Sequence, residues 1–438
     1  MSTLDDSIHK ELTDLEVVAE ANRCLFCFDA PCTRACPTHI DVASFIKKIV
    51  TGNLKGSART IMDANPMGAS CARVCPTENL CEGACVYAED SAPIRIGDLQ
   101  RYATDWARER RVVLFEAGAA TGKTVAIIGG GPAGLSAARE LRRMGHEVTI
   151  FDANAELGGL NTYGIVPFRL SRDVALWEAQ QVVDMGVAVR ARTVVGTDVS
   201  AEELLAGYDA VILACGMAAV PKLGVPGEEL DGVLDALEFI DRAKTDGKVA
   251  ALGSNVIVIG AGNTAIDALT CSRRLGAERV AMYYRRSEAE ITAYPFEYDF
   301  AKQEGVEFRW RCAPKRILGK NRRVSGVQFV RTHEQPVDGR VRKPPVEVTG
   351  SEFEVEADTV IRAIGQDRRV DLFERLGVKH RGGVVQVNGD LATSRPRVFA
   401  AGDCIFAKGQ REAMVVEAAE QGKIAARSVA RALENGHG

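Results

Sequence analysis

The sequence predicts an α/β protein that begins with an α-helical domain and continues as two interleaved α/β domains. Its 438 residues leave room for about three domains. Eight of the 12 cysteines lie between residues 24 and 85, around a stretch with helical hydrophobic spacing. Further along the chain, two glycine-rich turns each follow a short run of β-branched residues. The cysteines therefore predict the helical domain, and the two turns predict the α/β domains.

Composition and charge exclude several classes of protein. Hydrophobic residues make up 46% of the chain and charged residues 26%, which are ordinary values for a globular protein and exclude a largely disordered chain. No apolar run approaches the roughly 20 residues of a membrane-spanning helix. The net charge of −4 offers no basic surface for nucleic acid, and the acidic first residues do not resemble a signal peptide. We therefore expect a cytoplasmic protein that binds neither nucleic acid nor membranes.

The first predicted element is a metal-binding helical domain. Its cysteines form two groups, Cys-x2-Cys-x4-Cys-x3-Cys-Pro at residues 24–37 and Cys-x3-Cys-Pro-x4-Cys-x3-Cys at residues 71–85, and apolar residues at 42–49 between them have helical spacing. Disulfides are disfavoured because cytosolic thiols stay reduced, and neither group has the paired spacing typical of zinc. Both groups resemble the ferredoxin run in which thiolates hold 4Fe–4S clusters. A zinc-stapled helical domain is the alternative.

The second predicted element is a dinucleotide-binding unit of the Rossmann type. A β-branched run at residues 125–128 leads into the turn GGGPAG, then into a helix that ends near Gly145 and a strand that ends at Asp152. Glycines permit the tight turn and the close approach to a pyrophosphate, while the acid binds the ribose hydroxyls. A glycine turn that binds nothing is the alternative. The candidate cofactor-binding residues are Gly129, Gly131, Pro132, Ala133, Gly134 and Asp152.

The same pattern recurs at residues 255–286. The turn GAGNTA opens a helix, and the next strand ends in two arginines where the first unit has its acid. Arginine accommodates a 2′-phosphate, which favours NADPH over NADH. Glu288 and Glu290 would oppose a phosphate, however, and a solvated surface pair is the alternative interpretation of the arginines. The candidate nucleotide-binding residues are Gly262, Asn263, Thr264, Ala265, Arg285 and Arg286.

The last predicted element closes the first α/β domain. The strand PRVFAA leads into Gly402 and Asp403, and a helix of small residues begins near Ala413 and Met414. Flavoproteins with two dinucleotide sites close their FAD site in this way, with the acid near the ribityl and phosphate groups and the helix N-terminus facing the flavin. The FAD domain is therefore discontinuous. We predict an α-helical iron–sulfur domain at 1–115, FAD-binding parts at 121–219 and 364–438, and an NAD(P)-binding domain at 220–363.

The motifs together resemble the glutamate synthase small-subunit superfamily, which includes the N-terminal half of dihydropyrimidine dehydrogenase and its separate bacterial flavin subunit. The resemblance covers the whole chain and rests on CLFCFDAPCTRACP, CARVCPTENLCEGAC, IGDLQRYATD, GGGPAGLSAARE, GGLNTYGIVPFRL, GAGNTAID and VFAAGDC. Gln100 in IGDLQRYA and the segment FVRTHEQ favour the pyrimidine branch, since glutamate synthases resemble the first segment with glutamate in that place.

This resemblance implies a set of ligands and contacts. One 4Fe–4S cluster would be held by Cys24, Cys27, Cys32 and Cys85, and a second by Cys36, Cys75, Cys81 and Gln100, with Cys71 a bystander. Gly159, Leu160 and Arg169 would contact FAD, and Ala363, Ile364 and Gly365 would line the cofactor passage. The later basic residue that the family uses for the 2′-phosphate is Thr292 here, which weakens the preference for NADPH.

A flavin between nicotinamide and clusters is a chemical requirement, because nicotinamide delivers a hydride and a cluster accepts one electron at a time. The sequence shows no catalytic acid, base or nucleophile. We predict an enzyme subunit that takes hydride from NAD(P)H onto FAD and passes single electrons through 4Fe–4S clusters to a partner subunit. The resemblance implies that this partner carries FMN and further clusters and reduces uracil and thymine to 5,6-dihydropyrimidines.

Three alternatives stay open. The partner is the large subunit of glutamate synthase, the chain serves another ferredoxin-linked NAD(P)H oxidoreductase such as an electron-bifurcating transhydrogenase, or it is a binding module that holds cofactors structurally. Flavin disulfide reductases are excluded, because no Cys-x4-Cys follows Gly158 and Gly159. The remaining cysteines form no CxxC pair and are expected to pack in the core: Cys215, Cys271, Cys312 and Cys404.

Overall fold

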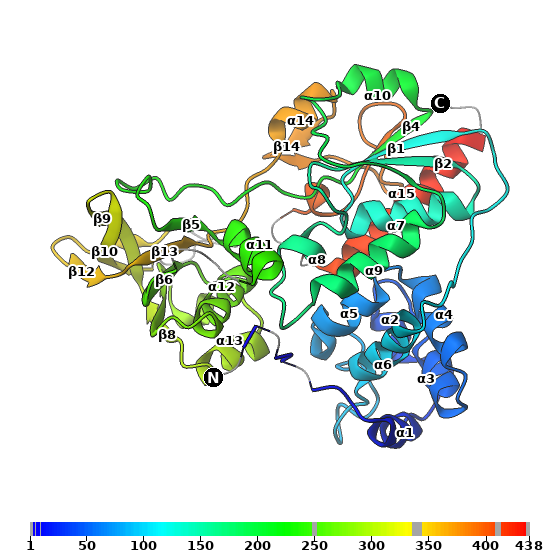
Figure 1. The fold of residues 1–438 in the computed structure, drawn as a ribbon, viewed down its shortest axis with the longest axis horizontal. Helices are drawn as coiled ribbons and strands as arrows, with labels where there is room; N and C mark the ends of the chain where they lie inside the picture. Colours follow the sequence, from blue (N-terminus) through cyan, green and yellow to red (C-terminus); the bar gives the residue numbers. More distant parts are fainter. Residues whose placement is uncertain are drawn as a thin grey trace. The chain divides into compact units, whose positions relative to one another are not determined.

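The computed structural model describes residues 3–4, 6–8, 10–247, 252–334, 344–407 and 413–434 (Figure 1). The chain forms two compact units. The smaller unit comprises Met1–Ile8, Tyr163–Phe168 and Ala218–Asp367, and the larger comprises His9–Thr162, Arg169–Met217 and Arg368–Gly438. Both the mixed α/β class and the helical N-terminal domain agree with the prediction from sequence.

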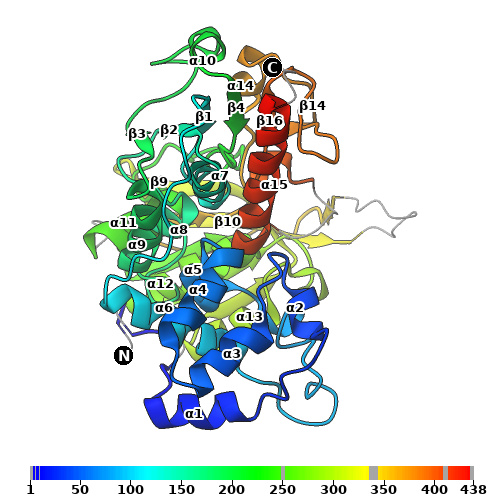
Figure 2. The ribbon, with the colours of Figure 1, turned by 90° about the vertical axis from the view of Figure 1, so that its right-hand side faces the viewer.

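The N-terminal part of the larger unit is helical (Figure 2). Its helices are α1 (Asp14–Asn22), α2 (Pro31–Ala35), α3 (Val42–Val50), α4 (Leu54–Ala64), α5 (Gly68–Val74) and α6 (Ile96–Glu109), with a 3-10 turn η1 (Thr77–Asn79) after α5. A capping box of Thr13 and Glu16 starts α1, and the Asp41 side chain caps α3. The apolar spacing at residues 42–49 becomes the buried face of α3.

A parallel five-stranded sheet forms the rest of the larger unit, in the order β16-β4-β1-β2-β3. The strands are β1 (Thr124–Ile128), β2 (Glu147–Phe151), β3 (Ala188–Arg190), β4 (Ala210–Leu213) and β16 (Val398–Ala400). The helices are α7 (Pro132–Arg143), α8 (Leu160–Tyr163), α9 (Arg172–Val183), α10 (Ala201–Gly207), α14 (Val370–Arg375) and α15 (Val415–Glu434); α8 ends at the first residue of the smaller unit's 163–168 segment. The short strands β14 (His380–Arg381) and β15 (Val384–Val385) pair with each other, and the 3-10 turn η3 (Asp403–Ile405) follows β16. Because Ala400 pairs with Leu213, the chain returns late to complete this sheet.

The helical domain and the sheet meet at the ends of helices within the larger unit. The last carbonyls of α4 accept hydrogen bonds from two cations: Arg139 of α7 donates to Met62 O and, at 2.8 Å, to Asp63 O, and Lys423 of α15 donates to Ala64 O at 2.6 Å. Positive side chains suit this end of a helix because its carbonyls carry partial negative charge.

The smaller unit contains a second parallel five-stranded sheet, in the order β5-β13-β6-β7-β8. Its strands are β5 (Val233–Asp235), β6 (Asn255–Ile259), β7 (Arg279–Tyr284), β8 (Glu307–Trp310) and β13 (Thr359–Arg362). Its helices are α11 (Ala236–Asp246), α12 (Asn263–Arg274) and α13 (Pro295–Gln303), with a 3-10 turn η2 (Glu288–Glu290).

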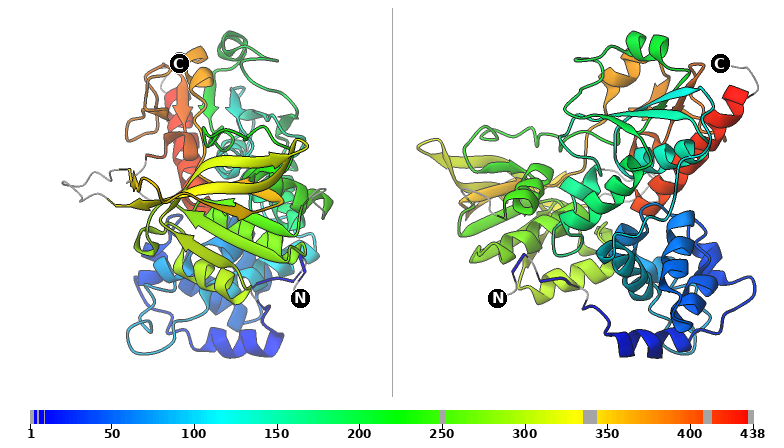
Figure 3. Two further views of the ribbon diagram at one scale, coloured as in Figure 1. Left: turned by 90° about the vertical axis from the view of Figure 1, so that its left-hand side faces the viewer. Right: turned by 45° about the vertical axis from the view of Figure 1, so that its right-hand side comes forward.

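The smaller unit also has an antiparallel sheet that the sequence analysis did not predict (Figure 3, left). It consists of β9 (Cys312–Lys320), β10 (Arg323–His333), β11 (Val346–Glu347) and β12 (Phe353–Glu356). Tyr283 of β7 stacks on Phe329 of β10 with ring centroids 4.1 Å apart, so the two sheets of this unit share one apolar core. In the described part of the chain, no helix is long and apolar enough to cross a membrane.

Candidate cofactor sites

The glycine turn after β1 has no room for side chains. Gly129 adopts φ +104°, and a Cβ there would lie 2.4 Å from the Ala214 carbonyl oxygen at the end of β4. A Cβ on Gly134 would lie 1.9 Å from the Gly129 oxygen. Gly131 precedes the first turn of α7, which begins at Pro132. This geometry brings the backbone close to the N-terminus of α7, where a pyrophosphate would be bound in a dinucleotide site of this type.

Asp152 lies just after β2 and is 6% exposed. Its Oδ2 accepts a hydrogen bond from the Gly130 N–H at 2.7 Å, and its Oδ1 accepts one from Asn154 N–H at 2.7 Å. Each carboxylate oxygen keeps a further lone pair for a ribose hydroxyl. The backbone of the glycine turn therefore orients the Asp152 carboxylate.

Gly402 and Asp403 meet this turn from the C-terminal segment. A Cβ on Gly402 would lie 3.0 Å from the Ala133 Cβ, and the Gly402 N–H donates to Gln421 of α15 at 2.7 Å. Burial raises the pKa of Asp403, an effect that Arg368 opposes. The Arg368 guanidinium donates to the Asp403 carbonyl at 2.8 Å.

The other expected FAD contacts differ in their surroundings. A Cβ on Gly159 would lie 2.8 Å from the Gly131 Cα, so Gly159 lies against the glycine turn. Leu160 is 39% exposed, and Arg169 is half-buried. Ala413 is exposed and Met414 half-buried directly before α15.

The glycine turn of the smaller unit repeats this geometry. Gly260 adopts φ +138°, and a Cβ there would lie 2.1 Å from the Ala363 carbonyl oxygen. Gly262 precedes α12, whose first residue Asn263 accepts a hydrogen bond from Tyr294 N–H at 3.0 Å. The structure therefore brings Ala363 to the turn that contains Gly262, Asn263, Thr264 and Ala265.

The two arginines after β7 have different surroundings. Arg285 is exposed, whereas the Arg286 guanidinium forms an ion pair with Glu290 at 2.7 Å, with side chains 11% and 20% exposed. Thr292 donates to the Ala261 carbonyl at 3.2 Å and lies beside the glycine turn. Glu290 therefore offsets the charge of the arginine that would bind a 2′-phosphate.

Four cysteines line one small cavity of the helical domain: Cys24, Cys27, Cys32 and Cys85. Its other lining residues are mostly apolar and include Val42, Ile46 and Ile94. Burial, with a smaller contribution from the neighbouring thiols of Cys85 and Cys24, raises the pKa of Cys32 to about 11. Soft thiolates in an apolar shell are the donors that iron–sulfur clusters use, so this cavity fits such a cluster.

A second group of thiols lies around α5. A hydrogen bond with Cys71, burial and the nearby thiols of Cys81 and Cys36 all raise the pKa of Cys75. Cys71, expected to be a bystander, is thus in contact with this group. Gln100 of α6 is 7% exposed and its amide Nε2 donates to the Gly68 carbonyl at 2.7 Å, so its Oε1 is the atom left to bind iron.

Among the described residues, no three or more His, Cys, Asp or Glu side chains are arranged to hold a single metal ion. The thiolates of a 4Fe–4S cluster bind different iron atoms and stand further apart than the ligands of one ion. Of the other four cysteines, Cys271, Cys312 and Cys404 are buried, and half-buried Cys215 shares a hydrogen bond with Cys404.

The chain matches two family models. Residues 2–112 match the family described as dihydropyrimidine dehydrogenase domain II, 4Fe-4S cluster, and residues 123–422 match pyridine nucleotide-disulphide oxidoreductase. With the two glycine turns and the two thiol groups, these matches define an NAD(P)H-dependent oxidoreductase that uses FAD and 4Fe–4S clusters.

Two relatives place the chain more closely. It is 34% identical to the glutamate synthase [NADPH] small chain of Escherichia coli K12 over 98% of this chain and 93% of the relative. It is also 34% identical to the NAD-dependent dihydropyrimidine dehydrogenase subunit PreT of Salmonella typhimurium over 98% of this chain and 97% of the relative. The chain belongs to the glutamate synthase small-subunit superfamily, which includes both proteins.

Solved structures show the fold of the flavin and nucleotide parts. The NADPH complex of FprA from Mycobacterium tuberculosis is similar with a TM-score of 0.58 and 20% identity, covering 72% of this chain and 85% of that one. The sequence analysis missed four residues that the structure places at these sites or beside them: Glu178, Arg368, Gln421 and, as a contact of Cys75, Cys71. No local pattern marks Glu178, Arg368 or Gln421, because each reaches its site from another element, whereas Cys71 belongs to the cysteine motif itself.

Proposed function

We propose that this chain is the cytoplasmic electron-input subunit of a heteromeric dihydropyrimidine dehydrogenase. It takes hydride from NAD(P)H and delivers single electrons to a partner subunit with FMN and further clusters, which reduces uracil and thymine to 5,6-dihydropyrimidines. Bound FAD supplies the conversion between a two-electron and a one-electron carrier. The protein's own part is to bind, orient and shield these groups, since hydride transfer to a flavin needs stacking and exclusion of water rather than an acid or a base.

The observation that carries the pyrimidine branch is Gln100. Its side chain is buried, and the bond from its Nε2 to Gly68 orients the amide beside α5, the helix directly before Cys75. When one atom of a side-chain amide is hydrogen-bonded to the backbone, its oxygen is held in one orientation toward the metal, as hydrogen bonds to the ligands do in other metal sites. The thiol of Cys71, which touches Cys75, is the competing fourth ligand.

The proposal assigns each cofactor to residues of one chain. FAD would be held by Gly129, Gly131, Pro132, Ala133, Gly134, Asp152, Gly159, Leu160, Arg169, Gly402, Asp403, Ala413 and Met414. The nicotinamide nucleotide would be held by Gly262, Asn263, Thr264, Ala265, Arg285, Arg286, Ala363, Ile364 and Gly365. The clusters would be held by Cys24, Cys27, Cys32 and Cys85 and by Cys36, Cys75, Cys81 and Gln100, with domain boundaries as predicted from the sequence.

The test is uracil-dependent oxidation of NADH and NADPH by this chain mixed anaerobically with a pyrimidine-binding FMN subunit from the same genome. Dihydrouracil formation that requires both proteins is the expected result. Prompt bleaching of the flavin without uracil reduction would contradict the pyrimidine assignment. A flavin that stays oxidised under excess NADH and NADPH would contradict electron input altogether.

A second candidate is the small subunit of glutamate synthase, which the equal identity of 34% to that chain favours. Gln100→Glu and Cys71→Ser, compared by electron paramagnetic resonance (EPR) of the reduced protein, separate the two. If Gln100 binds a cluster, Gln100→Glu changes one cluster spectrum and Cys71→Ser leaves both unchanged. The opposite result would assign the ligand to Cys71 and remove the main argument for the pyrimidine branch.

A further inference from the structure

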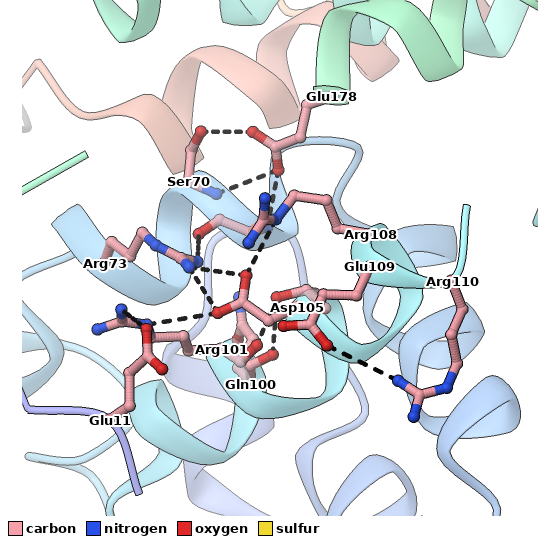
Figure 4. A network of polar contacts seen from close by, with 12 residues as sticks. Glu11, Ser70, Arg73, Gln100, Arg101, Asp105, Arg108, Glu109, Arg110 and Glu178 are labelled. Carbon is pink, nitrogen blue, oxygen red and sulfur yellow. Dashed lines mark hydrogen bonds and ion pairs between the residues drawn. The ribbon is translucent and has the colours of Figure 1, made fainter. Parts of the chain in front are cut away.

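Glu178 of α9 has a buried carboxylate that accepts hydrogen bonds from α5 of the helical domain (Figure 4). It is 1% exposed. Its Oε1 accepts hydrogen bonds from Ala69 N–H at 2.7 Å and Ser70 N–H at 3.1 Å, and its Oε2 accepts one from the Ser70 hydroxyl. All three donors belong to the first turn of α5.

The same turn of α5 is held from its other side by α6. Gln100 donates to the Gly68 carbonyl at 2.7 Å, and Arg73 of α5 forms an ion pair with Asp105 of α6 at 2.6 Å. Arg73 also donates to the Ala69 carbonyl at 3.1 Å. The first turn of α5 thus has one partner from α9 and another from α6 (Figure 4).

Burying the Glu178 carboxylate costs free energy of folding, and hydrogen bonds to the carboxylate offset this cost. Burial raises the pKa of Glu178 to about 7, although the hydrogen bonds from Ser70 and Ala69 and the charge of Arg73 oppose the shift. A buried carboxylate is tolerated where several donors bind it. Its bonds here fix the backbone that accepts the Gln100 amide and that leads to Cys71 and Cys75.

We propose that Glu178 is a positioning residue for the 4Fe–4S cluster that Cys36, Cys75, Cys81 and Gln100 would hold. It holds the first turn of α5 and thereby sets the position of Gln100 and Cys75 at that cluster. This inference rests on the proposed function, because it assumes that the thiol group around α5 binds a 4Fe–4S cluster. It adds a contact between the flavin-binding part and the helix that carries Cys71 and leads to Cys75.

The experiment compares Glu178→Ala and Glu178→Gln in the full chain, reconstituted anaerobically, with Glu203→Ala as control. Glu203 forms the capping box of α10 with Ser200, so its removal deletes the same kind of contact at a helix away from the thiols. The readouts are the EPR spectrum and reduction potential of each cluster, and hydrogen exchange at the Ala69 and Ser70 amides.

Glu178→Ala should change the EPR spectrum and the reduction potential of one cluster only, and it should speed hydrogen exchange at Ala69 and Ser70. Electron transfer should slow about tenfold, the lower end of the effect that follows when a residue supporting a metal ligand is removed. Glu178→Gln should restore the spectrum, because its amide oxygen accepts from both N–H groups and its nitrogen donates to the Ser70 hydroxyl. Glu203→Ala should change neither cluster. Unchanged cluster signals in Glu178→Ala would overturn the inference, as would a Gln variant no better than Ala.

Reference variants separate this inference from the proposed function. If Cys36→Ser and Gln100→Ala both leave the two cluster spectra unchanged, the proposed ligand set is wrong and the inference falls with it. If they alter one spectrum that Glu178→Ala leaves intact, the inference alone is wrong. Should Glu178→Ala not fold, Ser70→Ala removes one of the three bonds, and an unaltered spectrum in that variant overturns the inference.

Discussion

The two parallel sheets match strand for strand, which makes their differences informative. In the larger unit the order is β16-β4-β1-β2-β3, and in the smaller unit it is β5-β13-β6-β7-β8. Gly129 after β1 and Gly260 after β6 both have positive φ, and a Cβ on either would lie within 2.4 Å of the carbonyl oxygen that follows the neighbouring strand. In both turns, glycine is therefore required for the same reason: the backbone passes too close to a neighbouring carbonyl oxygen to leave room for a side chain.

The difference lies in the partners of the charged residues that follow β2 and β7, the strands that come after each glycine turn in the chain. In the larger unit, backbone N–H groups of Gly130 and Asn154 bind both oxygens of Asp152. In the smaller unit, the carboxylate of Glu290 binds Arg286. The first arrangement orients a charge for a ribose, whereas the second offsets a charge that a phosphate needs. The residue type at this position therefore indicates a cofactor, but its neighbours decide how strongly.

The largest expected effect comes from the glycines themselves. Gly129→Ala should abolish FAD binding, and Gly260→Ala should keep FAD but abolish its reduction by NADH and NADPH, because a Cβ at either position meets backbone atoms. Flavin absorbance per protein and anaerobic bleaching measure the two outcomes. Gly389→Ala is the control, since a Cβ there meets nothing within 4 Å. Normal flavin content in Gly129→Ala would contradict the assignment of FAD to this turn.

Replacing the acid of the larger unit should have the next largest effect. Asp152→Asn removes the charge that a ribose hydroxyl would meet and weakens the bond to Gly130. Hydrogen bonds to charged groups contribute about 1.5–3 kcal/mol, so FAD affinity should fall roughly 10- to 100-fold. Titration of the apoprotein with FAD measures it. Unchanged FAD affinity with altered NAD(P)H affinity would reverse the assignment of the two units.

The two units should also differ in their response to pH. The pKa of Glu178 in the folded protein is raised by burial to about 7 from its ordinary value of 4.5, so the folded larger unit binds this proton more tightly than the unfolded chain. Its free energy of unfolding should fall as the pH rises from 4.5 to about 7, by about 1.4 kcal/mol per pH unit at most. Urea unfolding at several pH values, with Glu178→Gln as the comparison, measures this slope. A slope that survives in Glu178→Gln would assign it to other groups.

The smallest expected effect concerns nucleotide preference. Glu290→Gln removes the negative charge beside Arg286 and should raise the preference for NADPH over NADH by about 1 kcal/mol, roughly fivefold, the value of one partly exposed charge pair. The ratio of kcat/KM for flavin reduction by the two nucleotides measures it. Arg286→Ala should shift the ratio the other way. If neither variant changes the ratio, Arg286 does not contact the 2′-phosphate, and the contrast with Asp152 concerns structure alone.

Sequence reasoning predicted the parallel sheets and both glycine turns, because each depends on a β-branched run followed at once by glycines. It missed the antiparallel sheet of β9, β10 and β12. β9 and β10 pair as a hairpin, but the two residues of its turn, Asn321 and Arg322, adopt positive φ without a glycine, and the register shifts beside Gly326. The contact between the Cys71 and Cys75 thiols across one turn of α5 is seen only in the structure, and the expectation that Cys71 binds no cluster stays a prediction. The spacing of cysteines indicates a cluster, but it does not show how each helix turns its thiols.

The sequence by itself determined the class of cofactors and the positions of the two glycine turns, since the positive φ of Gly129 and Gly260 belongs to the turn that the motif specifies. Only the tertiary structure decided which distant residues meet. Glu178 reaches the first turn of α5, Cys85 joins Cys24 in one cavity, and β16 completes a sheet begun at β1. Local preferences extend over a few residues, whereas these contacts depend on how whole helices and strands pack.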